Sequence, residues 1–286
     1  MGAYLIRKAY LLVFVTLGVT AFAFSLNYLF PGDPLSNMTG LQNLPPELTA
    51  ELNKIYKLDS NIIVQYWAYM SRILEGNWGV SFINEMGVYS QVFNVLPATI
   101  ELAAYALLYS FIVAIPLGIL ASDVRKPWLD KPILAISLIG FSMPIFWFAL
   151  ILILIFSINL GWLPISGRLS LIYQVPNVTG FILIDIALAD IPYKAEAYYD
   201  AFKHLAMPTL VLAAYPTTVL IRTTRQAMHN VLDTSYVKAA KAKGLSNYQV
   251  LTRHALRNGL LPVIQMLGTH FGTLITLAMV TEVIFS

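Results

Sequence analysis

The stretch DTSYVKAAKAKGLSNYQVLTRHALRNGLLPVI, residues Asp233–Ile264, is basic and rich in helix formers, and it lies between two strongly apolar segments. Three residue types that favour helix N-caps, at Asp233 to Ser235, precede the strong helix formers of YVKAAKAK. Gly244 follows them, and a glycine supplies the left-handed residue that ends many helices. The pattern therefore predicts two short helices on either side of Gly244.

The first predicted helix has two different faces. Tyr236, Ala239 and Ala240 fall on one face at spacings of three and four residues. Lys238 and Lys241 lie on another face. Small alanine side chains allow a partner's surface to approach the backbone closely, so the alanine face is a candidate contact. The alternative is an ordinary basic loop that is solvated by water and lipid headgroups.

The second predicted helix begins at Ser246. Gln249 stands three residues further on, in the register of a capping box. Arg253 and Arg257 share one face of this helix, and Pro262 marks the entry to the next apolar segment.

The composition of the whole chain indicates a membrane protein. Of its 286 residues 58% are hydrophobic and 12% are charged, against about 25% charged in ordinary soluble proteins. A crossing helix needs roughly 20 apolar residues, and Pro144 and Pro216 predict a kink or interruption in the third and fourth segments. We therefore expect an all-α polytopic protein, a single transmembrane domain over residues 1–286, with spans at about residues 9–30, 98–121, 133–160, 208–221 and 260–284.

The basic residues predict the orientation of these spans, because short cytoplasmic loops carry an excess of Lys and Arg. With the N-terminus in the cytoplasm, twelve of the eighteen basic residues fall inside, so the positive net charge is an orientation signal and indicates no nucleic-acid partner. The inside residues are Arg7, Lys8, Arg125, Lys126, Lys131, Arg222, Arg225, Lys238, Lys241, Lys243, Arg253 and Arg257.

Two long segments, residues 31–97 and 161–207, then lie outside. Aromatic residues between Tyr66 and Phe82 favour an interfacial belt or a small exterior subdomain for the first. The second contains GFILIDIALADIP, which is too short for a span and suits an interfacial piece. Glu101, near the start of the second span, is expected to complement the dipole of its own helix.

Motifs for catalysis, nucleotide binding or metal binding are absent from the sequence. There is no GxxxxGK[ST], no HExxH and no CxxC, and the chain has no cysteine. Its four histidines are far apart in sequence, with no carboxylate at ligand spacing. We therefore expect no catalytic residue, no metal site and no enzyme activity in this chain.

A polar stripe follows the last apolar segment, beside a GxxxG pair that permits close helix contact. One interpretation is that it lines a path through the membrane. The other is that its threonines bond their own backbone carbonyls and pack between helices. The stripe consists of Gln265, Thr269, Thr273 and Thr276.

The basic stretch resembles the EAA loop of bacterial ABC-transporter permeases. Ala239, Ala240, Gly244 and the Leu261–Pro262 pair match that pattern, whereas Lys238 stands where the family often has glutamate. Four other motifs resemble the dipeptide/oligopeptide branch of these permeases: PGDP at 31–34, GVSF at 79–82, LPATIEL at 96–102 and GWLPISGR at 161–168. Within that branch the chain most resembles the permeases of the Sap peptide transport system, through GFILID at 180–185, PTT at 216–218 and LAMVTEVIFS at 277–286.

The resemblance implies a permease bundle like those of type I importers, in the bacterial inner membrane. It implies a heterodimer with a second permease, two cytosolic ATPase subunits that bind ATP-Mg, a periplasmic substrate-binding protein, and no cofactor in this chain. Residues 233–262 would couple the permease to an ATPase. The candidate coupling residues are Tyr236, Lys238, Ala239, Ala240, Gly244, Leu245, Arg253, Arg257 and Pro262.

The expected function is ATP-driven transport of peptides, including antimicrobial peptides. A putrescine export permease of the same class is one alternative, and a subunit of a secondary transporter or channel is another. Family members usually continue beyond the residue equivalent to Ser286 with a sixth span. The five spans found here therefore lead us to expect a truncated or incompletely recorded chain.

Overall fold

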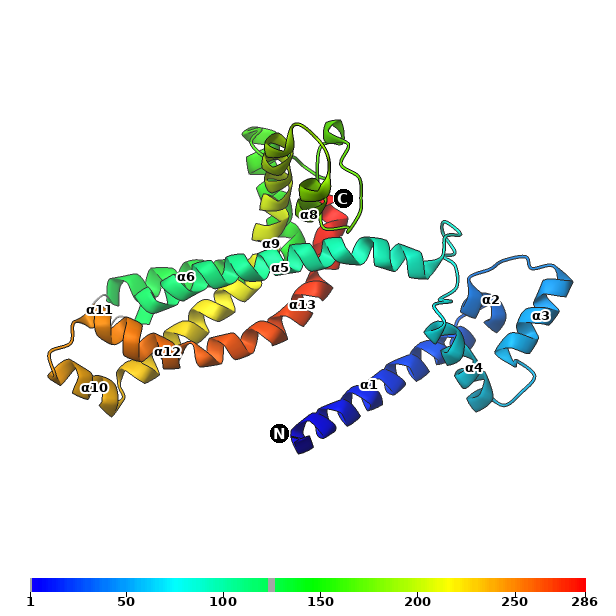
Figure 1. Cartoon of the computed structure of the whole chain (residues 1–286), viewed down its shortest axis with the longest axis horizontal. Helices are drawn as coiled ribbons and strands as arrows, with labels where there is room; N and C mark the ends of the chain where they lie inside the picture. The colour runs from blue at the N-terminus through cyan, green and yellow to red at the C-terminus, as the bar shows by residue number, and fades with distance from the viewer. Residues whose placement is uncertain (1, 123–126) are drawn as a thin grey trace. The chain divides into compact units, whose positions relative to one another are not determined.

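The computed structural model describes residues 2–122 and 127–286. Arg125 and Lys126, which enter the orientation argument, lie outside the described residues. Throughout the described ranges the chain is built from helices joined by turns and loops, with one isolated bridge between Val80 and Gly87 (Figure 1). The expected all-α class is confirmed.

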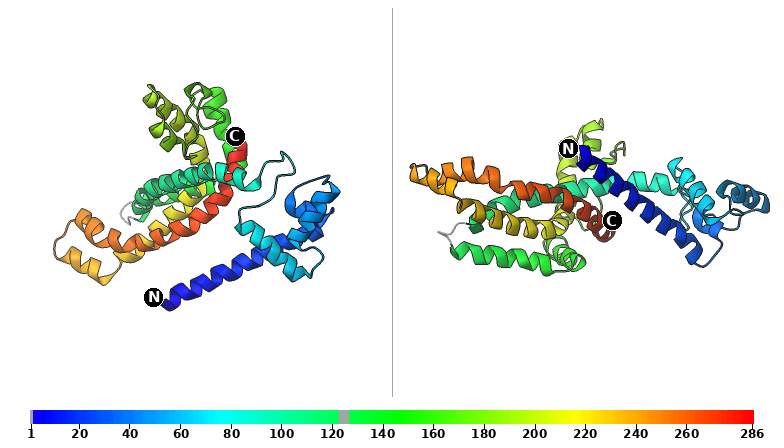
Figure 2. Two further views of the ribbon diagram at one scale, coloured as in Figure 1. Left: turned by 45° about the vertical axis from the view of Figure 1, so that its right-hand side comes forward. Right: turned by 90° about the horizontal axis from the view of Figure 1, so that it is seen from below.

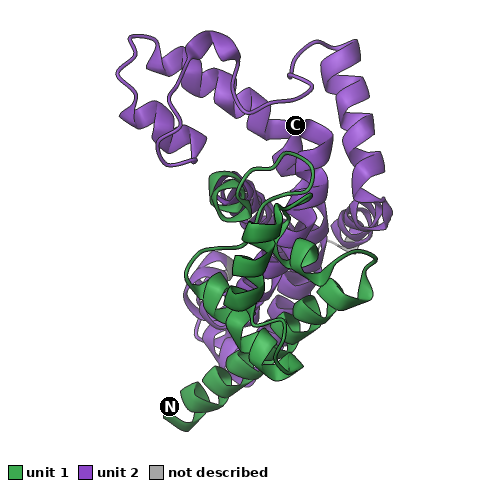
Figure 3. Cartoon of the chain, turned by 90° about the vertical axis from the view of Figure 1, so that its right-hand side faces the viewer, with its two compact units in different colours: residues 1–95 green, residues 96–286 purple. Residues whose placement is uncertain are grey.

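Two compact units divide the chain, Met1–Val95 and Leu96–Ser286 (Figure 3). The single transmembrane domain expected over residues 1–286 stays a prediction, which this division into compact units does not test. Each unit has its own buried apolar cluster or clusters, which accounts for the division.

The first unit contains α1 (Gly2–Leu29) and three short helices, and its core forms around the end of α1. Phe24 is buried there and meets the rings of Tyr66 and Tyr69 at 5.6 and 5.5 Å. These two tyrosines therefore pack inside the unit rather than forming an interfacial belt, whereas Trp67 and Phe82 are exposed. The short helices are α2 (Pro34–Thr39), α3 (Pro46–Tyr56) and α4 (Ile62–Leu74).

The PGDP motif starts α2. The Asp33 carboxylate accepts a hydrogen bond from the Ser36 amide at 3.1 Å, and Pro34 occupies the first helical turn. A side-chain cap and a proline at this position both suit a helix start, since the first amides have no partner within the helix.

The second unit begins with most of α5 (Val88–Ser122), which continues through Pro97 and Pro116. The expected third span is broken rather than gently kinked. The segments Trp128–Ser142 and Ile145–Asn159 meet at an angle of 104°, with Pro144 at the break. These segments correspond to α6 (Pro127–Ser142), α7 (Ile145–Leu152) and the π-helical η1 (Ile153–Asn159).

Helix α9 (Lys194–Leu232) is far longer than the segment expected at residues 208–221. Pro208 and Pro216 lie inside it and are both buried. Proline removes a backbone hydrogen bond and bends a helix, and α9 changes direction in its middle part (Figures 1 and 2). The buried packing of this part holds the helix together across both prolines, which sequence alone did not indicate.

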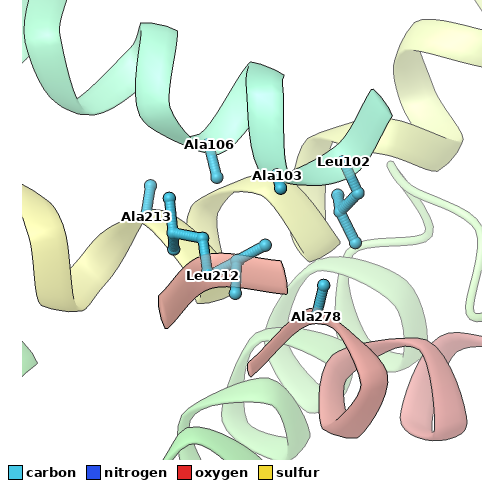
Figure 4. Close-up of a cluster of buried hydrophobic side chains, with 7 residues drawn as sticks. Leu102, Ala103, Ala106, Leu212, Ala213 and Ala278 are labelled. Carbon is cyan, nitrogen blue, oxygen red and sulfur yellow. The ribbon is translucent and has the colours of Figure 1, made fainter. Parts of the chain in front are cut away.

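Small residues let α5, α9 and α13 (Leu261–Phe285) approach one another closely. Ala103 and Ala106 of α5 face Leu212 and Ala213 of α9, with Ala278 of α13 beside them (Figure 4). Such side chains permit close helix contact in membranes. The three helices therefore form the centre of the second unit.

Within residues 2–122 and 127–286, four helices are long and apolar enough to cross a membrane: α1, α5, α9 and α13. The bent pair around Pro144 raises the number to five if it counts as one span. This agrees with the five expected spans. The segment at residues 161–207, which the sequence predicts to lie outside, contains η2 (Leu171–Tyr173) and α8 (Ile182–Leu188).

Candidate functional site: the loop between α9 and α13

The first helix of the loop, α10 (Ser235–Ala242), ends as its sequence predicts. Gly244 is left-handed, with φ +85°. Its amide donates to the Lys241 carbonyl at 3.0 Å, and the Leu245 amide donates to the Ala240 carbonyl at 3.4 Å. These two bonds are those of a Schellman motif. Since a Cβ on Gly244 would meet open space, the glycine is required by backbone conformation and not by crowding.

The start of α10 differs from the expectation. Thr234 occupies the N-cap position, but no side chain caps the helix there. The Thr234 hydroxyl instead donates to the Val231 carbonyl at 2.6 Å, at the end of α9. The threonine therefore stabilises the turn that leaves α9.

The second helical segment begins with the predicted capping box. The Ser246 amide donates to Gln249 Oε1 at 3.0 Å, and the Gln249 amide donates to Ser246 Oγ at 3.3 Å. The two side chains thus satisfy each other's free amides. The segment continues as α11 (Asn247–Gln249), the π-helical η3 (Val250–Ala255) and α12 (Leu256–Gly259).

A small apolar cluster holds the two helices of the loop together. Val237 and Val250 are buried, and Ala240 is 6% exposed between them. The interpretation of Ala240 as part of the exposed alanine face is therefore wrong: its neighbour one turn back, Val237, defines a buried stripe. Ala239 is exposed and remains available to a partner. Leu245, Val231 and Leu232 pack around the cluster.

Tyr236 joins α10 to the second helix through its hydroxyl group. The Asn258 side-chain amide donates to Tyr236 Oη at 2.9 Å, and Oη lies 3.4 Å from the His254 carbonyl oxygen. The ring itself is 42% exposed. Tyr236 therefore stabilises the loop and also presents an aromatic surface to the outside.

The basic side chains of the loop point outward. Lys238 lies 3.5 Å from Asp233, and both side chains are mostly exposed. Lys241, Arg253 and Arg257 are exposed as well. An exposed ion pair stabilises a protein little. These charges therefore contribute mainly to the positive electrostatic potential at the surface of the loop.

Both ends of the loop are attached to long helices. A Cβ on Gly259 would lie 2.7 Å from Met228 Sδ, so α12 crosses α9 closely. Pro262 lies in the first turn of α13, where proline fits because the first amides are unbonded. The loop is therefore a fixed element at the end of α9 and α13 (Figures 1 and 2).

The polar stripe occupies an open face of α13. Gln265, Thr269, Thr273 and Thr276 are all exposed. The only side-chain bond among them in the described structure is from Thr273 Oγ1 to the Thr269 carbonyl, at 3.4 Å. Cβ atoms on the two glycines of the GxxxG pair would meet nothing within 4 Å. Within this chain the stripe does not pack between helices.

A buried carboxylate was missed as an organising residue. Glu101, 3% exposed, accepts hydrogen bonds from Arg168 Nη2 at 2.6 Å, from Tyr105 Oη at 3.2 Å and from the amides of Ile182 and Leu183 at 3.0 and 3.4 Å. It lies well inside α5 and complements the start of α8, not that of its own helix. In the sequence, Glu101 belongs to the LPATIEL motif and Arg168 to the GWLPISGR motif. These two motifs were the signals that could have indicated the pair.

The comparisons with known proteins cover the whole chain. Residues 114–286 match the family "binding-protein-dependent transport system inner membrane component", and residues 1–103 match the N-terminal family of the same systems. The boundary between the two matches lies close to the boundary between the two compact units.

The names of individual relatives mention two kinds of cargo, peptides and putrescine. The chain is 41% identical to the di/tripeptide transport permease DppB of Pseudomonas aeruginosa, over all of this chain and 84% of the relative. It is 39% identical to the peptide transport permease SapB of Salmonella typhimurium and to the putrescine export permease SapB of Escherichia coli K12, over all of this chain and 82% of each. The dipeptide and Sap branches are thus matched about equally well. By its sequence match and its helical fold, the chain belongs to the inner membrane components, or permeases, of binding-protein-dependent transport systems.

Proposed function

We propose that this chain forms half of the translocation pathway of an ATP-driven peptide transporter in the bacterial inner membrane. A second permease supplies the other half. The observation that carries the proposal is the loop between α9 and α13: it is fixed internally by its Schellman motif, capping box and Tyr236 hydroxyl, yet its basic side chains point outward. An element with these properties suits docking to a partner.

The partner of the loop is proposed to be a cytosolic ATPase subunit, one of a pair that binds ATP-Mg. Tyr236 and Ala239 of α10 and Lys243 at its C-cap are exposed at spacings of three and four residues and form the candidate docking face. Arg253 and Arg257 extend the basic surface on the second helix. Movement of the ATPase pair would then move the loop and, through it, α9 and α13.

This arrangement places the N-terminus in the cytoplasm. Most basic residues outside the apolar segments then lie on the cytoplasmic side, as membrane insertion favours. The outer segments face a periplasmic substrate-binding protein, which would deliver the cargo.

The open polar face of α13 is proposed to line the path of the substrate. Because the chain has no cysteine, single-cysteine variants can be labelled without a background reaction. Thr273→Cys should react with a water-soluble maleimide in the assembled transporter and be protected by peptide. Ile112→Cys, at an exposed apolar position of α5, serves as the lipid-facing control. Equal reactivity of the two variants would contradict the proposal.

Peptides are the favoured cargo, because relatives from both branches are named for peptide transport. Putrescine is the second candidate, because one relative that is 39% identical is named for putrescine export. Nothing in the comparisons favours a secondary transporter or channel. Labelled dipeptide and labelled putrescine, offered on either side of proteoliposomes that contain the whole complex, decide between the two cargoes and give the direction.

Coupling is tested with two substitutions of Gly244 in the same proteoliposomes. Gly244→Val should abolish ATP-driven transport, because a β-branched residue strongly disfavours the left-handed backbone of the Schellman motif. Gly244→Asn is the control, since asparagine tolerates that conformation, and it should retain most of the transport rate. Full transport by Gly244→Val would show that the helix-ending turn is not needed for coupling.

A further inference from the structure

A hollow of about 630 Å³ lies between α6, α9 and the start of α13. Its lining residues on α9 lie between Val219 and Asn230, near the end of the helix that leads into the loop. Its wall from α9 includes Arg222, Gln226 and Asn230, which follow one another at intervals of four residues and so lie along one side of the helix. The function proposed above makes no use of this hollow.

The polar side of the hollow is rich in hydrogen-bond donors. Gln226 Nε2 donates to Asn230 Oδ1 at 2.9 Å, so the side-chain amide hydrogens of Asn230 are left for another acceptor. Among residues 2–122 and 127–286 no acid lies within 4.0 Å of the Arg222 guanidinium nitrogens. Such a group of donors suits an oxyanion.

The second arginine in the wall has its charge neutralised. Arg225 makes a two-pronged ion pair with Asp130 of α6, at 2.6 Å for each bond. This pair joins α6 to α9 and so fixes the width of the hollow. Arg222 therefore supplies the positive charge with which a ligand would interact.

Apart from Thr223, the remaining wall residues are apolar. Leu134 of α6, Val219 and Ala227 of α9, and Pro262 of α13 face the hollow. A small inorganic anion would leave this surface uncovered. A ligand that carries an anionic group at one end and hydrocarbon at the other would cover both kinds of wall.

We propose that the hollow binds one anionic phospholipid. Its phosphate lies against Arg222 and the amides of Gln226 and Asn230, and an acyl chain runs along Leu134 and Pro262. Basic pockets between membrane helices on the cytoplasmic side are suited to anionic headgroups. The proposal goes beyond the transport function and does not depend on which substrate is carried.

Native mass spectrometry of the purified full-length chain tests the proposal. After delipidation, the protein should retain phosphatidylglycerol from mixed micelles and retain phosphatidylcholine about tenfold less. Arg222→Gln should lower phosphatidylglycerol binding about tenfold, and Gln226→Leu should lower it less. Arg253→Gln, which removes the same charge from an exposed position outside the hollow, should leave binding unchanged. Size-exclusion profiles confirm that the variants remain folded.

Competition distinguishes a lipid from other anions. Inorganic phosphate at millimolar concentration should not displace phosphatidylglycerol, and neither should a dipeptide with a free carboxylate. Displacement by phosphate alone would reduce the hollow to a simple anion site, and displacement by dipeptide would assign it to the substrate. Either result, or equal losses in Arg222→Gln and Arg253→Gln, would overturn the proposal.

Discussion

Two regions of the second unit, the surroundings of Glu101 in α5 and the loop between α9 and α13, use charged residues in opposite ways. Glu101 is buried and its carboxylate is surrounded by donors from Arg168, Tyr105 and α8. The loop is held by an apolar cluster and backbone caps, while its lysines and arginines stay exposed. The Glu101 carboxylate thus finds its partners within the chain. The basic side chains of the loop are exposed and can bind another protein.

The largest loss of stability is expected when Glu101 is replaced. Glu101→Ala would leave the Arg168 guanidinium without its partner and the first amides of α8 without an acceptor. Breaking a buried ion pair costs about 3 kcal/mol or more, and we expect about 3 kcal/mol here because Arg168 is partly exposed. Chemical unfolding in detergent micelles measures the change. The double variant with Arg168→Met should recover part of the loss, and no recovery would show that the two residues act independently.

A smaller effect is expected where the first helix of the loop ends. Gly244→Val forces a β-branched residue to φ near +85°, which costs about 1–2 kcal/mol. Hydrogen exchange should increase over α10 and the second helical segment and remain unchanged in α5. Faster exchange throughout the second unit would mean that the loop is not a local element.

The capping box should matter less. Gln249→Ala removes one of two reciprocal bonds, and the loss of a cap interaction costs about 1 kcal/mol. Because the two capping bonds lie at the surface, the effect should be limited to the local segment. Gln226→Ala, an exposed glutamine of α9 outside the box, is the matched control, and the same increase in exchange at α11 in both variants would contradict the assignment.

The smallest effect on stability is expected at Lys238. Lys238→Glu removes only an exposed contact with Asp233, so the free energy of unfolding should change by less than about 0.5 kcal/mol. The variant reverses one of the exposed charges of the loop, beside the proposed docking face. A change in ATP hydrolysis by the complex, with unchanged stability, would show that this charge faces the ATPase. A large loss of stability would mean that the loop depends on its charges internally.

Much of the loop could be predicted from its sequence because its bonds are local. Gly244 and the Ser246–Gln249 pair act within five residues along the chain, so residue type and spacing were sufficient. Ala240 was misplaced because its burial depends on Val250, which approaches only after the chain turns at Gly244.

The longer contacts could not be read from the sequence. Glu101 and Arg168 are separated by 67 residues. Nothing in the LPATIEL motif or in the GWLPISGR motif indicates that the two side chains form a pair. The length of α9 was underestimated because two prolines normally bend or end a helix, and only the packing around them shows that the helix continues. The division into two units has the same origin, since it reflects which apolar surfaces meet.

The continuity of α9 has a mechanical consequence. Its 39 residues follow a path of about 58 Å at 1.5 Å per residue. One end packs against α8 through Ile186, Ala197 and Ala201, and the other end leads into α10. The helix contains Pro208 and Pro216 and changes direction in its middle part (Figure 1), so its two ends point in different directions. A displacement of α10 is therefore transmitted along the continuous helix α9 to residues 161–207. The direction of the displacement changes where the helix bends.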